Sequence, residues 1–359
     1  MEISADDMTS RQTTNVSDSD YELVELMCQP QRKREFTFTG YDIMSDIDPD
    51  ICDGEQHLET DHHLRLYLDA CKLFGVLPLV CVKKSLQKPD MVMRNASIDW
   101  RDTRALAVAL VGNQYVKCLD LHGNNLGPKG VISLSEMLAE NVTITDINNA
   151  SLRELRCSHN KFGEIGGLYL GPAIASNDTI EVLDLSWNHL RGKGAMAVAA
   201  GMETNGGVKT LNISWNGFGK DGCSVLAQSL LSNATMTELD VSCNRVDKQG
   251  VAALMRGLQG NEVLETLRIG QNPISPDIAV SILRTIELLP KCSITHLDLK
   301  DVAVNEDFLK LGEKIINVRN LRIQTGPLLT KGEFIKEYTT IANRKSKSLP
   351  ESVDCQQQS

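Results

Sequence analysis

Residues 180–218 read IEVLDLSWNHLRGKGAMAVAAGMETNGGVKTLNISWNGF and carry the clearest structural signal of the chain. It contains one eleven-residue phrase twice, IEVLDLSWNHL from Ile180 and VKTLNISWNGF from Val208, so the two copies begin 28 residues apart. A fixed period of this length predicts a solenoid, because a single short unit cannot bury a core unless its neighbours stack against it.

The phrase LxxLxLxxNxL recurs on both sides of this stretch. It reads VKCLDLHGNNL, LRELRCSHNKF, MTELDVSCNRV and LETLRIGQNPI from residues 116, 152, 236 and 264. Its first three apolar residues, such as Ile180, Leu183 and Leu185, fit a short strand whose core side chains point inward while the residues between them face solvent. Stacked strands of this kind predict one continuous parallel sheet.

An asparagine closes each phrase, where the chain must turn away from its strand. Its amide can donate to and accept from backbone groups of adjacent turns that would otherwise lack partners. The predicted structural ladder is Asn124, Asn160, Asn188, Asn216, Asn244 and Asn272.

The second half of each unit has apolar residues four apart, for example Val198 with Met202 and Leu226 with Leu230, which predicts a helix packed on the sheet. Alternating strands and helices predict an α/β fold with a concave parallel sheet and outer helices. This unit is typical of the ribonuclease-inhibitor type of leucine-rich-repeat solenoid, or horseshoe.

The ends of the chain depart from the repeat. We expect an acidic, disordered leader over 1–62, a capping helix over 63–87, and a solenoid of about nine units over 88–330. A closing helix over 331–344 and a disordered tail over 345–359 complete the prediction. Terminal caps are needed because an end unit would otherwise expose its core face.

One interval breaks the period. Asn124 and Asn160 lie 36 residues apart, whereas the later ladder asparagines follow at 28. Two unit openings, ENVTITDIN and NNASLRELR, lie close together here, which favours a truncated unit near 142–151 that forms a stub strand or an extended excursion. The alternative is a genuine eight-residue loop.

Charge and composition restrict the class of partner. The net charge is −10, but residues 1–63 hold sixteen acidic and four basic residues, which leaves the body at about +2 (33 basic, 31 acidic). A near-neutral body argues against nucleic-acid binding. The ten cysteines lack metal-site spacing, and no apolar run reaches a membrane span, so we expect no metal, no cofactor and no membrane insertion. A cytoplasmic monomer is the prediction.

The segments YLDACKLFGVLP and NASLRELRCSHNKFGEIGG, with the tandem LDLSWNHLRGKGAMAVAAG and LNISWNGFGKDG, resemble the leucine-rich repeat-containing protein 74 group over about residues 64–330. The repeats are also similar to those of nucleotide-binding innate immune receptors, although no GxxxxGKS/T phosphate loop occurs. The group has no assigned biochemical activity, so the resemblance implies the fold more than the function.

Two sets of residues are candidates for partner binding. Trp187 and Trp215 share one repeat column with His159, and their rings should stack where the strands end, either as an interaction site or as a packing ladder. The middle column of the sheet mixes charges and suits a protein ligand, unless it is only a solvated surface. Its candidates are Asp120, Arg156, Asp184, Asp240 and Arg268.

No catalytic motif accompanies the seven histidines, so we predict that the chain is not an enzyme. The favoured function is a scaffold that binds a protein partner within a cytoplasmic, cytoskeletal or ciliary assembly. The alternatives are a GTPase-activating protein of the Ran-activator type, an innate-immune-like regulator and a nuclease inhibitor. Ran activators carry an acidic C-terminal tail and nuclease inhibitors are far richer in cysteine, and neither feature is seen here.

Overall fold

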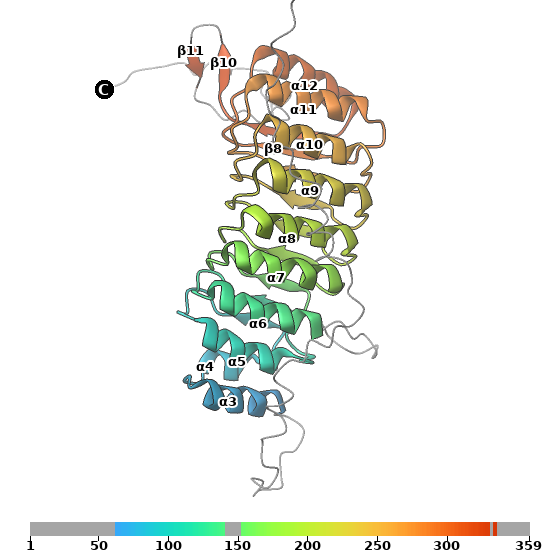
Figure 1. Cartoon of the computed structure of the whole chain (residues 1–359). Coiled ribbons are helices and arrows are strands. Elements are labelled where there is room, and N and C mark those ends of the chain that lie inside the picture. The colour runs from blue at the N-terminus through green and yellow to red at the C-terminus, as the bar shows by residue number, and fades with distance from the viewer. Residues whose placement is uncertain (1–61, 141–151, 331–332, 336–359) are drawn as a thin grey trace, which may run out of the picture.

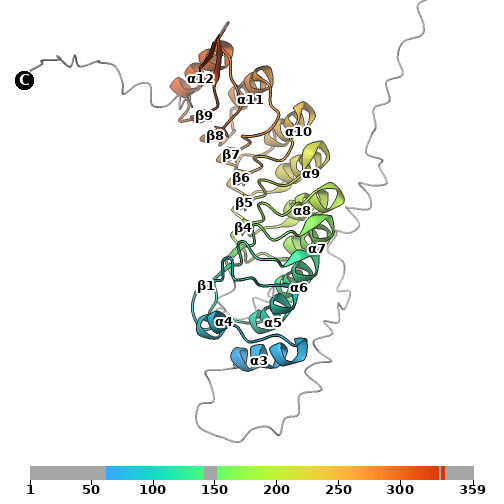
Figure 2. The same cartoon turned by 90° about the vertical axis from the view of Figure 1, so that its left-hand side faces the viewer.

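The computed structural model describes residues 62–140, 152–330 and 333–335. Nine short strands form one parallel sheet in chain order, and helices cover its outer side (Figure 1). The strands line the concave side of the curved solenoid (Figure 2). The sheet strands are β1 Asp90–Val92, β2 Cys118–Asp120, β3 Glu154–Arg156, β4 Val182–Asp184, β5 Thr210–Asn212, β6 Glu238–Asp240, β7 Thr266–Arg268, β8 His296–Leu299 and β9 Arg322–Thr325.

A helix follows each strand from β1 to β8, as the repeat predicts. These helices are α5 Trp100–Leu110, α6 Gly127–Glu140, α7 Gly163–Ser176, α8 Gly192–Thr204, α9 Gly219–Ser232, α10 Lys248–Leu258, α11 Pro276–Leu288 and α12 Glu306–Val318. The α/β leucine-rich-repeat architecture expected from the sequence is therefore confirmed.

The sheet is in register, so equivalent residues of the repeat are direct neighbours. Leu183 of β4 pairs with Leu155 and Leu211 on either side, and all three are buried between sheet and helices. Because every unit contributes the same inward positions, the core is one continuous aliphatic layer along the solenoid.

The ladder asparagines hold each turn against the preceding one. The Nδ2 of Asn188 donates to the carbonyl oxygens of Cys157 at 2.8 Å and Leu185 at 3.1 Å, and its Oδ1 accepts from the N–H of Asn160 at 2.8 Å. The other five donate in the same way to the carbonyl of the residue that follows the strand of the preceding unit. The amides, all but that of Asn216 buried, thus satisfy backbone groups that strand pairing cannot reach.

The outer helices of the central units approach one another through glycines. A Cβ on Gly171 of α7 would collide with the carbonyl oxygen of Ala197 in α8, and a Cβ on Gly201 would collide with that of Gly171. Glycine is therefore required for this close packing of α7 against α8.

The N-terminal cap differs from the single helix predicted over 63–87. Two helices are present, α3 His62–Phe74 and α4 Val80–Ser85, and the chain breaks between them at Gly75, whose φ of +65° lies in the left-handed region. The hydroxyl of Tyr67 accepts from the N–H of Leu79 at 2.9 Å and fixes this connection.

The 36-residue interval adds no strand to the sheet, because β2 pairs directly with β3. Helix α6 ends at Glu140, and the described chain resumes before β3. The excursion predicted for 142–151 lies outside the described residues, so its conformation stays a prediction.

The closing helix predicted over 331–344 is wrong where the structure describes it. Leu328–Thr330 (β10) and Glu333–Ile335 (β11) form an antiparallel pair instead. The reason is a backbone partner: the N–H of Leu329 donates to the carbonyl of Val304 at 2.7 Å, in the loop before α12. The rest of that segment, the leader up to 61 and the tail over 345–359 lie outside the described residues.

Candidate protein-interaction surface

Stacked aromatic rings mark the points at which the central strands end. The rings of Trp187 and Trp215 are 3.9 Å apart between centroids and inclined by 10°, and His159 stacks on Trp187 at 4.8 Å and 15°. His122 closes the other face of His159 edge-on at 4.9 Å. We call these four residues the aromatic ladder.

The backbone of the ladder places its rings outward. His159, Trp187 and Trp215 have φ values of 56° to 58°, in the left-handed region that costs energy for residues other than glycine. Hydrogen bonds to the next unit offset this cost, since the N–H of Trp187 donates to the carbonyl of Ser214 at 3.0 Å. Each indole stays 38% exposed, so the ladder is a ridge and not part of the core.

The acidic members of the middle column make backbone hydrogen bonds at the ends of their strands, and their predicted part in partner binding stays a prediction. Oδ1 of Asp184 accepts from the N–H of Ser186 at 3.0 Å, and Oδ1 of Asp240 accepts from that of Ser242 at 2.9 Å. Asp120 binds the N–H of His122 in the same way at 3.1 Å. These carboxylates end their strands through local Asx turns, so their charge is not needed for this function.

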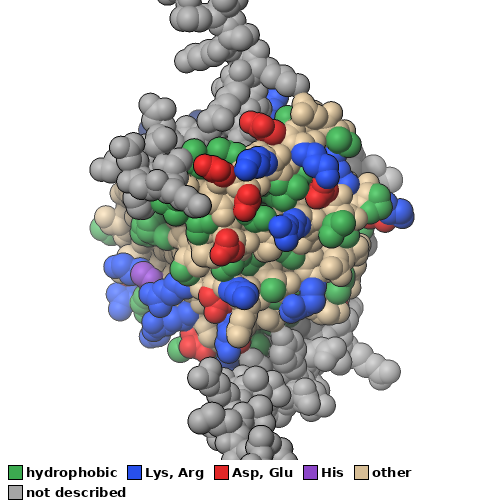
Figure 3. Space-filling model, turned by 90° about the horizontal axis from the view of Figure 1, so that it is seen from above, with side chains coloured by type: hydrophobic (Ala, Val, Ile, Leu, Met, Phe, Trp, Pro, Cys, Tyr) green, Lys and Arg blue, Asp and Glu red, His purple; other side chains and the backbone are tan. Residues whose placement is uncertain are grey.

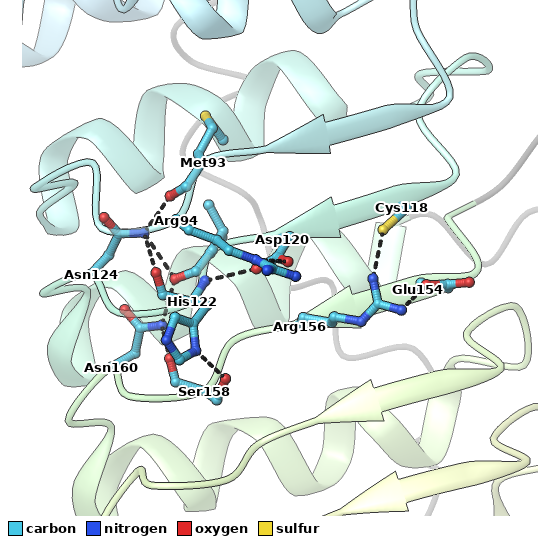
Figure 4. Close-up of polar contacts among 11 residues, drawn as sticks. Met93, Arg94, Cys118, Asp120, His122, Asn124, Glu154, Arg156, Ser158 and Asn160 are labelled. Atoms are coloured by element: carbon cyan, nitrogen blue, oxygen red, sulfur yellow. Dashed lines mark hydrogen bonds and ion pairs between the residues drawn. The ribbon is translucent and has the colours of Figure 1, made fainter. Parts of the chain in front are cut away.

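Charged residues at the N-terminal end of the sheet are paired among themselves (Figure 4). Nε of Arg94 lies 2.6 Å from Oδ2 of Asp120, and an Nη of Arg156 lies 2.6 Å from the Glu154 carboxylate. The other Nη of Arg156 donates to the Sγ of Cys118 at 3.3 Å. Both arginines are thus held in place by neighbouring side chains.

The same pairing continues along the sheet. Arg153 and Lys209 both contact Glu181, at 3.1 and 2.7 Å, and Arg268 contacts Glu238 at 3.3 Å. The hydrogen bond from Lys209 lowers the pKa of Glu181 below its usual range, and burial raises the pKa of Asp240. The basic side chains of the central strands therefore have acidic partners on the concave face itself.

The metal-ligating side chains and the thiols of the described ranges are the groups from which a metal centre or a thiol nucleophile could be built. No group of three or more histidine, cysteine or acidic residues there could hold a metal ion. Burial raises the pKa of the Cys157 thiol well above its usual value and that of Cys223 to about 12. Such thiols are protonated at neutral pH and are poor nucleophiles.

Comparison with known proteins agrees with this architecture. A family model described as "Leucine Rich repeat" matches residues 112–135, 176–199, 208–227 and 232–255. The fold is a leucine-rich-repeat solenoid. The family model does not separate one group of these proteins from another, so the likeness to the leucine-rich repeat-containing protein 74 group stays a prediction.

Solved structures offer more distant likenesses. "Leiomodin-1 Actin-Binding Site 2 (ABS2)" is 17% identical, with 53% of this chain and 94% of that chain covered and a TM-score of 0.36. A complex of Latrophilin 3, Unc5D and FLRT2 matches at 15% identity, 63% and 67% coverage and a TM-score of 0.38. An internalin from Listeria monocytogenes matches at 13% identity, 76% and 89% coverage and a TM-score of 0.26.

The described helices include none that is long and apolar enough to cross a bilayer.

Two features of the surface were missed in the sequence. The acidic column precedes a serine by two residues in the DLS of β4 and the DVS of β6, a spacing that signals an Asx turn. His122 belongs to a different repeat column from His159, but Gly123 leaves the ladder position without a side chain in that unit, so His122 can cover the open ring.

Proposed function

We propose that this chain is a non-catalytic scaffold that binds a protein partner through the aromatic ladder and the adjoining concave sheet. The carrying observation is the exposed stack of Trp187 on Trp215, held outward by left-handed backbone. Tryptophan is enriched among residues that dominate binding energy, because it brings a large apolar area at little entropic cost.

The repeat geometry supports this function. A rigid sheet presents each ladder ring at a fixed position, so a partner meets an ordered surface and little conformational entropy is lost on binding. The paired charges beside the ladder suit selectivity, since an incorrect partner would have to break existing ion pairs. A cytoplasmic monomer remains our expectation for the free protein.

The test is affinity capture from cytosol with the full-length chain, read by quantitative mass spectrometry. The ladder variant Trp187→Ala/Trp215→Ala is compared with Tyr169→Ala, which removes an exposed aromatic from the outer face of α7. We expect proteins bound by the native chain and by the Tyr169 variant to be lost from the ladder variant, which should stay folded and melt only a few degrees lower than the native chain. Equal capture by the ladder variant would reject the ladder as the binding site.

A further inference from the structure

The loops that join strands to helices carry a second set of charges, beside the aromatic ladder. We call these loops, together with the first turn of each following helix from α7 to α10, the strand-exit edge. Resting on the proposed scaffold function, we infer that this edge binds an extended, acidic segment of the partner protein.

Five basic side chains of the edge have no acidic partner among the described residues. Lys161, Arg191, Arg245 and Lys248 are exposed and Lys220 is half-buried. None of these five forms an ion pair with any residue that the structure describes. Lys161 has only a neutral contact, donating from Nζ to Oδ1 of Asn125 at 3.2 Å. The cations on and beside the central strands β3 to β7 are paired with acids of the sheet, whereas these five are not, so the edge can offer its positive charge to an anion from elsewhere.

The acids of the edge are fewer and mostly serve the backbone. Asp247 caps α10 by accepting from the N–H of Gly250 at 2.9 Å, and Glu164 accepts from the N–H of Lys193 at 3.0 Å. Asp221 lies in the first turn of α9. Three carboxylates against six basic residues, which are the five unpaired cations and Lys193, leave the edge positive, although the whole chain is acidic.

The space-filling view is consistent with this excess of basic over acidic side chains. Seen along the solenoid axis, Lys and Arg side chains gather with a histidine on one side, whereas acidic and basic side chains alternate across the rest of the view (Figure 3). That side carries β10 in Figure 1, and β10 pairs with the loop that leads from β8 to α12. The cluster therefore lies on the strand-exit side.

The spacing of the loops fits an extended peptide. Neighbouring strands are about 4.8 Å apart and packed helices about 8 to 10 Å apart, so the loops between them repeat at an intermediate distance. Alternate side chains of an extended chain repeat at about 6.6 Å, within that interval. A peptide lying along the edge can therefore present one acidic side chain to each unit.

The aromatic ladder favours a peptide over a nucleic acid. Single-stranded nucleic acids bind by stacking bases on open aromatic faces. Here Trp187 covers one face of Trp215 at 3.9 Å and His159 covers the other face of Trp187, so mostly ring edges are available. Ring edges suit aliphatic and backbone contacts along a peptide.

The experiment measures fluorescence anisotropy of a labelled octaglutamate peptide against the full-length chain, with octalysine as the control probe. The edge variant is Lys161→Gln/Arg191→Gln/Arg245→Gln/Lys248→Gln. The matched sheet variant, Arg153→Gln/Arg156→Gln/Lys209→Gln/Arg268→Gln, removes the same number of charges from the concave face. Melting temperatures verify that both variants are folded.

We expect octaglutamate to bind the native chain in a salt-dependent manner, with octalysine binding more weakly. Its affinity should fall at least about tenfold in the edge variant and less than about twofold in the sheet variant. Equal losses in both variants, or no loss in the edge variant, would overturn the inference. So would tighter binding of a labelled oligothymidine than of octaglutamate.

Two further outcomes identify the occupant and separate this inference from the scaffold proposal. Tighter octaglutamate binding after Asp46→Asn, Asp48→Asn and Asp50→Asn would support the site by showing that the chain's own acidic segment competes for it. Octaglutamate binding that depends on the edge, together with full capture by the Trp187→Ala/Trp215→Ala variant, would keep the acidic-peptide site and reject only the ladder.

Discussion

The concave sheet and the strand-exit edge belong to the same repeats but use their charges differently. On the sheet, Arg153 and Lys209 neutralise Glu181, and Asp184 accepts a backbone N–H at the end of its strand. On the edge, Lys161 and Arg245 have no ionic partner among the described residues. A column of charged residues in a repeat therefore does not by itself indicate a binding site, because those residues can be engaged in ion pairs and hydrogen bonds within the chain.

The largest loss of stability should follow from a substitution on the buried side of the strand-exit edge, where the ladder asparagines lie. Asn188→Ala should lower the free energy of unfolding by about 3 kcal/mol, because it leaves the buried N–H of Asn160 without an acceptor and removes a donor from the carbonyl of Cys157. Urea denaturation followed by circular dichroism measures the change.

Trp187→Ala is the control, since it alters the preceding residue on the exposed side of the same loop. It should cost only about 1 kcal/mol, the contribution of a partly exposed aromatic contact. Equal losses for the two variants would mean that the ladder rings belong to the folding core, and the distinction between the buried and exposed sides of the edge would fail.

The next prediction asks whether Asp184 of the sheet stabilises the fold through its charge or through its hydrogen bond. Asp184→Ala should destabilise the protein by about 1 kcal/mol through loss of the bond to the Ser186 N–H. Asp184→Asn should be nearly neutral, because Asn212 already makes the equivalent bond to Ser214 at 3.0 Å. Similar destabilisation by both substitutions would show that the negative charge of Asp184 is what the sheet requires.

A smaller effect is expected from the sheet ion pairs. Lys209→Gln should cost less than about 1 kcal/mol, and salt should reduce the difference, because the pair is largely exposed. It should also raise the pKa of Glu181 towards its ordinary value, measured by carboxyl chemical shifts in NMR. Because Lys209 depresses that pKa, its contribution is present above the unfolded-state pKa and is lost as the pH falls through the folded-state value.

Lys248→Gln is the matched control on the edge, where the lysine has no ion pair with the described residues. It should leave the Glu181 titration and the stability unchanged. A comparable loss of stability in this variant would show that the edge cations also serve the fold, and would weaken the case that they await a partner.

The solenoid and the stack of rings could be read from the sequence because each repeat position occurs in the same environment many times. The in-register sheet brings Trp187 and Trp215 together by the period alone, and the hydrogen bonds of Asn188 follow from its place at the turn. Errors concentrate where the period ends. The strand at Glu333–Ile335 depends on β10, which is anchored by the distant Val304, and no local pattern signals such a contact.

The pairing of surface charges could likewise not be predicted from the sequence. Whether Arg156 faces a partner or its neighbour Glu154 depends on side-chain rotamers and on the acids of adjacent units. Aligning the repeats shows at which position of the sheet a charged residue lies, but not which residue it pairs with. The contrast between the unpaired edge cations and the paired cations of the central strands therefore exists only in the folded structure.

The smallest expected effect is on the pH dependence of stability. It concerns His159, which lies between the concave sheet and the strand-exit edge. Its imidazole stacks on Trp187, and partial burial, followed by repulsion from His122, lowers its pKa below the ordinary 6.5, while Asp184 acts in the opposite direction. The folded state therefore binds fewer protons at this site than the unfolded chain. Its contribution to stability is full above pH 6.5 and declines as the pH falls through the folded-state pKa.

NMR titration of ¹³C-labelled histidine measures this pKa directly. His122→Asn should move the His159 pKa up towards 6.5 by removing the repelling charge, and leave unchanged that of His63, which burial lowers in the N-terminal cap. If His159 instead titrates above 6.5 in the native chain, the indole face and Asp184 stabilise the imidazolium more than burial disfavours it. The ladder would then carry positive charge near neutral pH and belong electrostatically with the strand-exit edge.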